Sequence, residues 1–100
     1  MVAQRIRDYE LVMVLRPEVT DEQVTEILQR VRDMVAQADG EVTEEDRWGL
    51  RRLAYPIQKL MEGYYVQLHL SMDADRVREM ERTMNTWEEL LRYLVMRREG

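Results

Sequence analysis

Thirteen consecutive residues in the middle of the chain, RWGLRRLAYPIQK at positions 47–59, carry four positive charges and no negative one. The cations are Arg47, Arg51, Arg52 and Lys59, in a chain whose formal net charge is -5. Guanidinium and ammonium groups donate hydrogen bonds to phosphate oxygens, and arginine does so through a planar fork. A segment of this kind in an acidic chain points to a phosphate-rich partner.

Two aromatic side chains, Trp48 and Tyr55, are interleaved with these cations. Bases of single-stranded or looped RNA stack on aromatic rings while arginine and lysine bind the phosphates. A purely structural reading fits equally well, because the aromatic residues could belong to the core and the cations could protect an edge strand from aggregation. The segment alone leaves both readings open.

The negative charge is concentrated elsewhere in the chain. Residues 39–46 hold five acids and no base, and residues 73–89 hold six acids against three arginines. Anionic helices beside a cationic strand would give the molecule two electrically different sides. The net charge therefore does not exclude a nucleic-acid partner.

No constellation of catalytic residues is present in the sequence. His69 is the sole histidine and the chain has no cysteine, so metal ligands are scarce. Ser71 is the sole serine and lacks the flanking glycines of a nucleophile elbow. The run Glu44–Asp46 is typical of a solvated acidic face. We therefore expect no enzyme activity, no metal, no cofactor and no small-molecule substrate.

Length and composition predict one globular domain over residues 1–100. Apolar residues make up 45% of the chain and charged residues 35%, which is too apolar for disorder. The absence of cysteine suits a reducing compartment. The first residues lack the apolar core of a signal peptide, and no stretch approaches the roughly 18 apolar residues of a membrane span. We expect a cytoplasmic protein without membrane contact.

Hydrophobic periodicity predicts a strand, a helix and a second strand in the first half. Residues 8–15 are apolar on both faces beyond the first residues, as in a central strand. Thr20 opens the helix and Gln23 completes a capping box. The second strand covers residues 41–53, and Pro56 places it at the edge of a sheet because proline cannot donate to a ladder.

The second half repeats this order of elements. Residues 64–70 alternate strictly enough for a half-buried strand. Asp73 or Asp75 then caps a second helix, and residues 90–96 form the last strand. The order predicts an α+β, ferredoxin-like βαββαβ fold, a four-stranded antiparallel sheet with two helices on one face.

The face of the third strand turned away from the helices is predicted to carry Tyr65, Gln67 and His69. This resembles the RNA-binding sheet of RNA-recognition domains, but without their full aromatic set or flanking basic-glycine signature. An open face of this kind could equally dock a second protein.

The string RRLAYPI at residues 51–57 resembles the hallmark of the bacterial small-ribosomal-subunit protein six family. It follows WG at 48–49 and precedes EGYYV at 62–66, and the segments RDYELVMVLRP at 7–17 and LLRYLVMR at 90–97 also fit. The resemblance implies a ferredoxin-like domain of the small ribosomal subunit. Because the chain begins a few residues before many family members, the comparison also implies a flexible arm at residues 1–6. It further implies binding to the central domain of 16S ribosomal RNA together with small-subunit protein eighteen.

Carried over position by position, the resemblance puts Arg7, Arg51 and Arg52 at RNA contacts, with Tyr55 beside them and Lys59 as a further contact. We expect the arginines to form one contiguous cationic surface facing the RNA. The main alternative is a non-ribosomal protein-interaction or ligand-binding regulatory module on the same fold. A second alternative is a homodimer joined through exposed edge strands.

Overall fold

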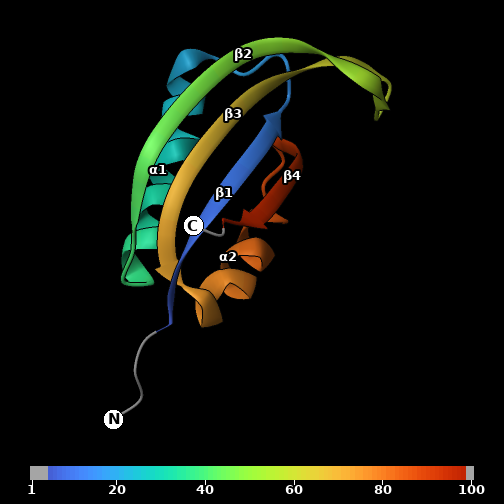
Figure 1. Cartoon of the computed structure of the whole chain (residues 1–100). Coiled ribbons are helices and arrows are strands. Elements are labelled where there is room, and N and C mark those ends of the chain that lie inside the picture. The colour runs from blue at the N-terminus through green and yellow to red at the C-terminus, as the bar shows by residue number, and fades with distance from the viewer. Residues whose placement is uncertain (1–4, 99–100) are drawn as a thin grey trace.

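The computed structural model describes residues 5–98 and contains four strands, two α-helices and one short 3-10 helix (Figure 1). Their order confirms the predicted strand–helix–strand–strand–helix–strand sequence. The elements are β1 (Ile6–Leu15), α1 (Asp21–Gln37), β2 (Glu41–Ile57), β3 (Leu60–Asp73), η1 (Ala74–Arg76), α2 (Val77–Met84) and β4 (Leu90–Arg97).

The strands form one antiparallel sheet in the order β2-β3-β1-β4. This is the predicted ferredoxin-like arrangement. β1 lies in the middle of the sheet, as its two apolar faces indicated. β2 lies at the edge, where the missing N–H of Pro56 costs no ladder hydrogen bond.

Both helices pack on the same face of the sheet, and the core lies between these two layers. Alternate residues of β1 and β3 meet the apolar stripe of α1 and two methionines of α2 there. The buried residues of this core are Tyr9, Leu11, Met13, Leu15, Val24, Ile27, Leu28, Val31, Val35, Ala38, Val66, Leu68, Leu70, Met72, Met80 and Met84. We call the opposite side of the sheet the open face.

The capping box at the start of α1 is present as predicted. The Thr20 hydroxyl accepts a hydrogen bond from the Gln23 amide at 3.1 Å, and the Gln23 side chain accepts one from the Thr20 amide at 2.8 Å. Two donors that a helix start leaves unpaired are thereby satisfied. This fixes where the chain leaves the loop after β1.

Two details differ from the sequence-based expectation. Asp73 caps η1, accepting a hydrogen bond from the Asp75 amide at 2.9 Å, and α2 begins at Val77 without a side-chain cap. Of the predicted arm, residues 1–4 lie outside the described residues. Ile6 already pairs with Asp73 in the sheet.

β2 and β3 are longer than predicted and continue past the end of β1 as a protruding hairpin (Figure 1). The last β1 residue, Leu15, pairs with Tyr64, so residues 51–63 extend beyond it. We call residues 51–63 the hairpin arm. Its turn residues Gln58 and Lys59 have φ angles of 51° and 69°, a left-handed pair that suits a two-residue hairpin turn.

Candidate nucleic-acid interface

Four of the five residues predicted to contact RNA lie on the hairpin arm. Arg51 pairs with Gly63 and Arg52 with Glu62, while Tyr55 follows in the irregular part of β2. Lys59 occupies the turn at the tip. The structure therefore brings Arg51, Arg52, Tyr55 and Lys59 together on one element, at the position furthest from the main core.

Arg51 and Arg52 point to opposite faces of the arm because successive strand residues alternate. Both are exposed. Within residues 5–98, the side chains of Arg51, Arg52 and Lys59 form no hydrogen bond and no ion pair. These three cations are therefore available to an external anion.

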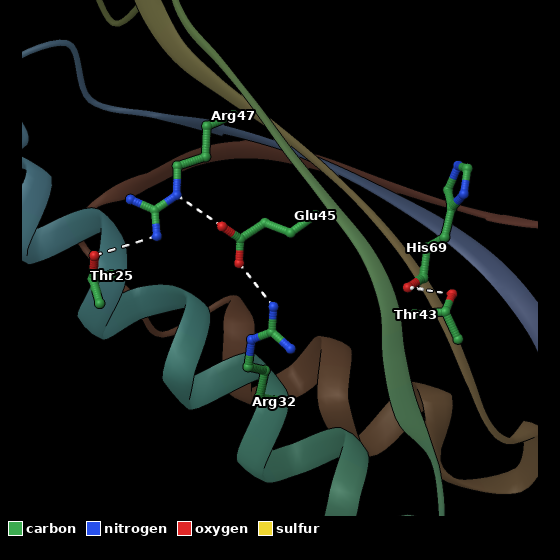
Figure 2. A network of polar contacts seen from close by, with 6 residues as sticks. All are labelled: Thr25, Arg32, Thr43, Glu45, Arg47 and His69. Atoms are coloured by element: carbon green, nitrogen blue, oxygen red, sulfur yellow. Dashed lines mark hydrogen bonds and ion pairs between the residues drawn. The ribbon is translucent and has the colours of Figure 1, made fainter.

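Arg47, the first cation of the same segment, is engaged inside the molecule instead. Figure 2 shows its guanidinium reaching the helix side of β2, where it donates to Glu45 at 2.9 Å and to Thr25 at 3.3 Å. Glu45 also accepts from Arg32 of α1 at 2.9 Å. This network ties the edge strand to α1 and removes Arg47 from the cationic surface.

The charge state of Glu45 follows from this geometry. The hydrogen bond from Arg32 is the main reason that the pKa of the Glu45 carboxyl lies below its ordinary value. Partial burial opposes this shift, and the hydrogen bond and charge of Arg47 add to it. Glu45 is therefore ionised at neutral pH, and its single carboxylate forms an ion pair with each of the two arginines.

Arg7 lies at the other end of the molecule from the arm. It pairs with Met72 near the start of β1. Arg51 instead pairs with Gly63, which lies nine residues before Met72 in β3. That separation corresponds to about 30 Å of extended strand. The expectation of one contiguous surface that includes Arg7 is therefore wrong, because the two positions lie at opposite ends of the sheet.

Tyr55 is held against a cation that the sequence reasoning missed. The Arg92 guanidinium of β4 lies over the Tyr55 ring, 5.0 Å from its centroid, and donates a hydrogen bond to its hydroxyl. Tyr55 itself remains 56% exposed. Arg92 lies in the segment LLRYLVMR noted above, but no local pattern pairs it with Tyr55, because the hairpin arm brings the two side chains together from distant parts of the chain.

Beneath the arm, a small apolar cluster lies apart from the main core. Val14 and Leu53 are both buried but belong to the open side of the sheet. A Cβ added at Gly63 would lie 2.4 Å from the Val14 side chain and 3.5 Å from Leu53. The absence of a side chain at Gly63 thus lets the arm pack down on the end of β1.

The open face carries an aromatic pair beside Arg51. The rings of Trp48 and Tyr65 are stacked, with centroids 6.1 Å apart and planes inclined by 11°. Both rings line a shallow depression together with Asp46, Arg47 and Arg51. Trp48 is thus a surface residue and not the core residue that the structural reading allowed.

His69 lies on the open face among charged neighbours. Its Nδ1 is 2.8 Å from a Glu44 oxygen and 3.2 Å from the Arg98 guanidinium, and Thr43 donates to its carbonyl oxygen (Figure 2).

Among residues 5–98, no three His, Asp or Glu side chains are placed to hold a metal ion. In the same part of the chain, no helix combines the length and apolar character needed to span a membrane.

Comparison with known proteins gives consistent matches over nearly the whole chain. The family described as Ribosomal protein S6 matches residues 8–97. The small ribosomal subunit proteins bS6 of Carboxydothermus hydrogenoformans and Caldanaerobacter subterraneus are each 40% identical over 92 residues. The matches cover 92% of this chain and 96% and 97% of those proteins.

A solved structure supports the same relationship. The crystal structure of 30S ribosomal protein S6 from Thermotoga maritima matches with a TM-score of 0.85 at 27% identity, covering 94% of this chain and 89% of that one. These relatives are ribosomal proteins and not enzymes, and the non-ribosomal alternative finds no support. The predicted family is confirmed: the chain belongs to the ribosomal protein S6 family, whose place is the small subunit of the bacterial ribosome, in the cytoplasm.

Proposed function

We propose that this protein is a structural constituent of the small ribosomal subunit that binds the central domain of 16S ribosomal RNA together with small-subunit protein eighteen, without catalytic activity. The main support for the proposal is, within the described residues, the set of unpaired cations on the hairpin arm. Its cations Arg51, Arg52 and Lys59 have no internal partner among residues 5–98. In contrast, Arg32 and Arg47 share an internal ion-pair partner, the Glu45 carboxylate.

The arm would bind RNA through charge and shape. Phosphate contacts from arginine and lysine position a protein on folded RNA, and they do not read sequence directly. Because Arg51 and Arg52 point to opposite faces, the arm would contact phosphates on both of its sides. Tyr55 would offer a planar contact beside them, with Arg92 adding a further cation.

Arg7 would make a separate contact at the far end of β1. Its guanidinium donates a hydrogen bond to the carbonyl of Ile6 at 2.9 Å, and it has no ion pair with any carboxylate of residues 5–98. Two contact regions at opposite ends of the sheet would fix the orientation of the protein on RNA more firmly than one.

The protein partner would need apolar surface, and the open face supplies some. Leu94 and Met96 of β4 are 54% and 40% exposed. They share this face with Val12, which pairs with Leu94 across the sheet. Exposed apolar side chains of this kind support a neighbouring protein on the open face.

The test is a double substitution on the arm, Arg51→Ala with Arg52→Ala, and the matched control is Arg78→Ala with Arg82→Ala on α2. Filter binding to a central-domain RNA fragment, with the partner protein present, would show weaker binding for the arm variant alone. Each lost phosphate contact should reduce the slope of log affinity against log salt by about 0.9. Unchanged affinity, or an equal loss for both double variants, would refute the proposed RNA contact.

A further inference from the structure

The stacked rings of Trp48 and Tyr65 have no role in the core. Neither belongs to the buried cluster between sheet and helices, and Trp48 is 39% exposed. They lie on the open face at the base of the hairpin arm, beside Arg51. An exposed tryptophan stacked on a half-buried tyrosine, next to a cation without a partner among residues 5–98, leaves apolar ring surface in water, and this suggests a ligand.

A bulge in β2 creates this arrangement. Arg47 pairs with Val66 and Gly49 pairs with Tyr65, so Trp48 is the extra residue between two ladder positions. Gly49 adopts a φ of 80°, and a Cβ placed there would meet no atom within 4 Å. The glycine thus accepts a left-handed backbone conformation that other residues rarely adopt, and the bulge places the Trp48 ring beside Tyr65.

The polar atom of Trp48 is already satisfied. Its indole N–H donates to the Asp46 carboxylate at 2.9 Å, which fixes the orientation of the ring. What the side chain still offers to a partner is its flat apolar surface. Such a surface accepts another planar ring, and base–aromatic stacking works with every base because each has a π-face.

The charges around the rings orient such a ligand. Arg51 borders the depression and makes no ion pair within residues 5–98, whereas Asp46 borders it as an anion. A ligand with a flat ring and a negative group would place the negative group toward Arg51 and away from Asp46. A nucleotide unit of RNA has these two parts at adjacent positions.

We propose that Trp48 and Tyr65 form a stacking site for one unpaired nucleobase of RNA, with Arg51 holding a neighbouring phosphate. The proposal rests on the proposed RNA-binding function and adds a residue-level contact to it. It assigns a direct role to two aromatic residues outside the arm. Of the two neighbouring arginines, only Arg51 lies on the open face and can take part in this site.

The first experiment uses the fluorescence of Trp48 in a Trp87→Phe protein, in which Trp48 is the single tryptophan. Titration with oligoadenylate should quench this fluorescence because the base stacks on the indole ring. An abasic ribose-phosphate oligomer of the same length should bind through phosphates without quenching. Equal quenching by both oligomers, or by neither, would overturn the stacking site.

The second experiment measures affinity for the central-domain RNA fragment with Trp48→Leu. Loss of one stacked base should weaken binding by about 5- to 150-fold. The salt dependence should stay unchanged because no phosphate contact is lost. Trp48→Phe should restore most of the affinity, and Leu50→Ala, at a more exposed apolar position on the other face of β2, should have no effect.

The outcomes separate this site from the RNA-binding function itself. If the Arg51 and Arg52 double variant binds weakly and Trp48→Leu binds normally, the protein binds RNA but the stacking proposal fails. If Trp48→Leu loses only the partner protein and keeps its affinity for RNA alone, the rings contact protein and the proposal also fails. If neither variant has an effect, the proposed function fails as well. Should Trp48→Leu not fold, the fluorescence titration decides.

Discussion

At the scale of single residues, the residue type alone does not decide which arginine side chain is available to bind an external anion. Arg47 and Arg51 stand four positions apart in the same cationic segment. Arg47 is held by Glu45 and Thr25 on the helix side, whereas Arg51 is unpaired within residues 5–98. The difference arises from the bulge between them, which changes the face that each side chain occupies.

Glu45 provides a prediction at this scale. Glu45→Gln removes the negative charge that Arg32 and Arg47 share, and should lower the free energy of unfolding by about 0.5–1 kcal/mol at neutral pH, as expected for a partly exposed network. Urea unfolding followed by circular dichroism measures the change. Glu41→Gln, an exposed glutamate in the same strand, is the control and should change stability by less.

The same variant predicts a pH dependence with a definite sign. Because the pKa of Glu45 is lowered in the folded state, its contribution is complete above the ordinary pKa of a glutamate in the unfolded chain. The contribution is lost as the pH falls through the lower, folded value. Wild type and Glu45→Gln should therefore differ in stability at pH 7 and converge in acid. A difference that grows in acid would contradict this assignment.

At the scale of elements, the junction between α1 and β2 depends on one glycine. A Cβ added at Gly40 would lie 1.8 Å from the Ser71 carbonyl oxygen, a backbone atom of β3 that cannot rotate away. Gly40→Ala must therefore push β2 away from β3 and should cost about 2–4 kcal/mol. Thermal unfolding measures this loss.

Gly49, inside β2, supplies the matched comparison. Its φ of 80° disfavours alanine, but the added methyl group would meet open space. Gly49→Ala should therefore cost only about 1–2 kcal/mol, the ordinary penalty for a left-handed conformation. Equal losses at Gly40 and Gly49 would mean that the close approach at Gly40 is relieved without moving the strands.

Most elements were predictable from the sequence because the chain marks their starts and periods clearly. The capping residues Thr20 and Gln23 and the alternation from Tyr64 to Leu70 gave the right element in the right place. The ends of β2 and β3 were not predictable. Their turn at Gln58 and Lys59 lacks the glycine or asparagine that usually signals a left-handed pair, and an edge strand tolerates Pro56.

The site was predictable only in part, for a physical reason. Arg51 and Arg52 carry a motif and a charge signal that can be read locally. The contact between Tyr55 and Arg92 joins residues 37 positions apart through the bend of the arm, which no local pattern encodes. The stacking of Trp48 on Tyr65 likewise depends on a register change and not on spacing.

At the scale of the whole molecule, the described structure is elongated, measuring 49 × 26 × 22 Å along its principal axes. The hairpin arm contributes to this length and leaves the layered part of the fold (Figure 1). It is supported by few contacts: the Val14–Leu53 cluster, Tyr55 with Arg92, and Gln58 with Arg16 at 2.9 Å. Local opening should therefore begin in the arm.

Arg92→Ala tests this view by hydrogen exchange with mass spectrometry. Loss of the contact with Tyr55 should accelerate amide exchange in residues 54–60 and leave the centre of β3, residues 66–70, unchanged. Arg97→Ala, an exposed arginine in the same strand without an ion pair among residues 5–98, is the control. Faster exchange throughout the sheet would show that the arm and the core open as one unit.

The interrupted pairing of β2 has a consequence for self-association. Its register with β3 shifts at three places, between Val42 and Glu44, between Arg47 and Gly49, and between Arg52 and Ile57. An incoming strand would therefore find only short runs of aligned amide and carbonyl groups along the outer side of β2. Long intermolecular ladders, and the fibrils that grow from them, are thus disfavoured at this sheet edge even at high concentrations of newly synthesised protein.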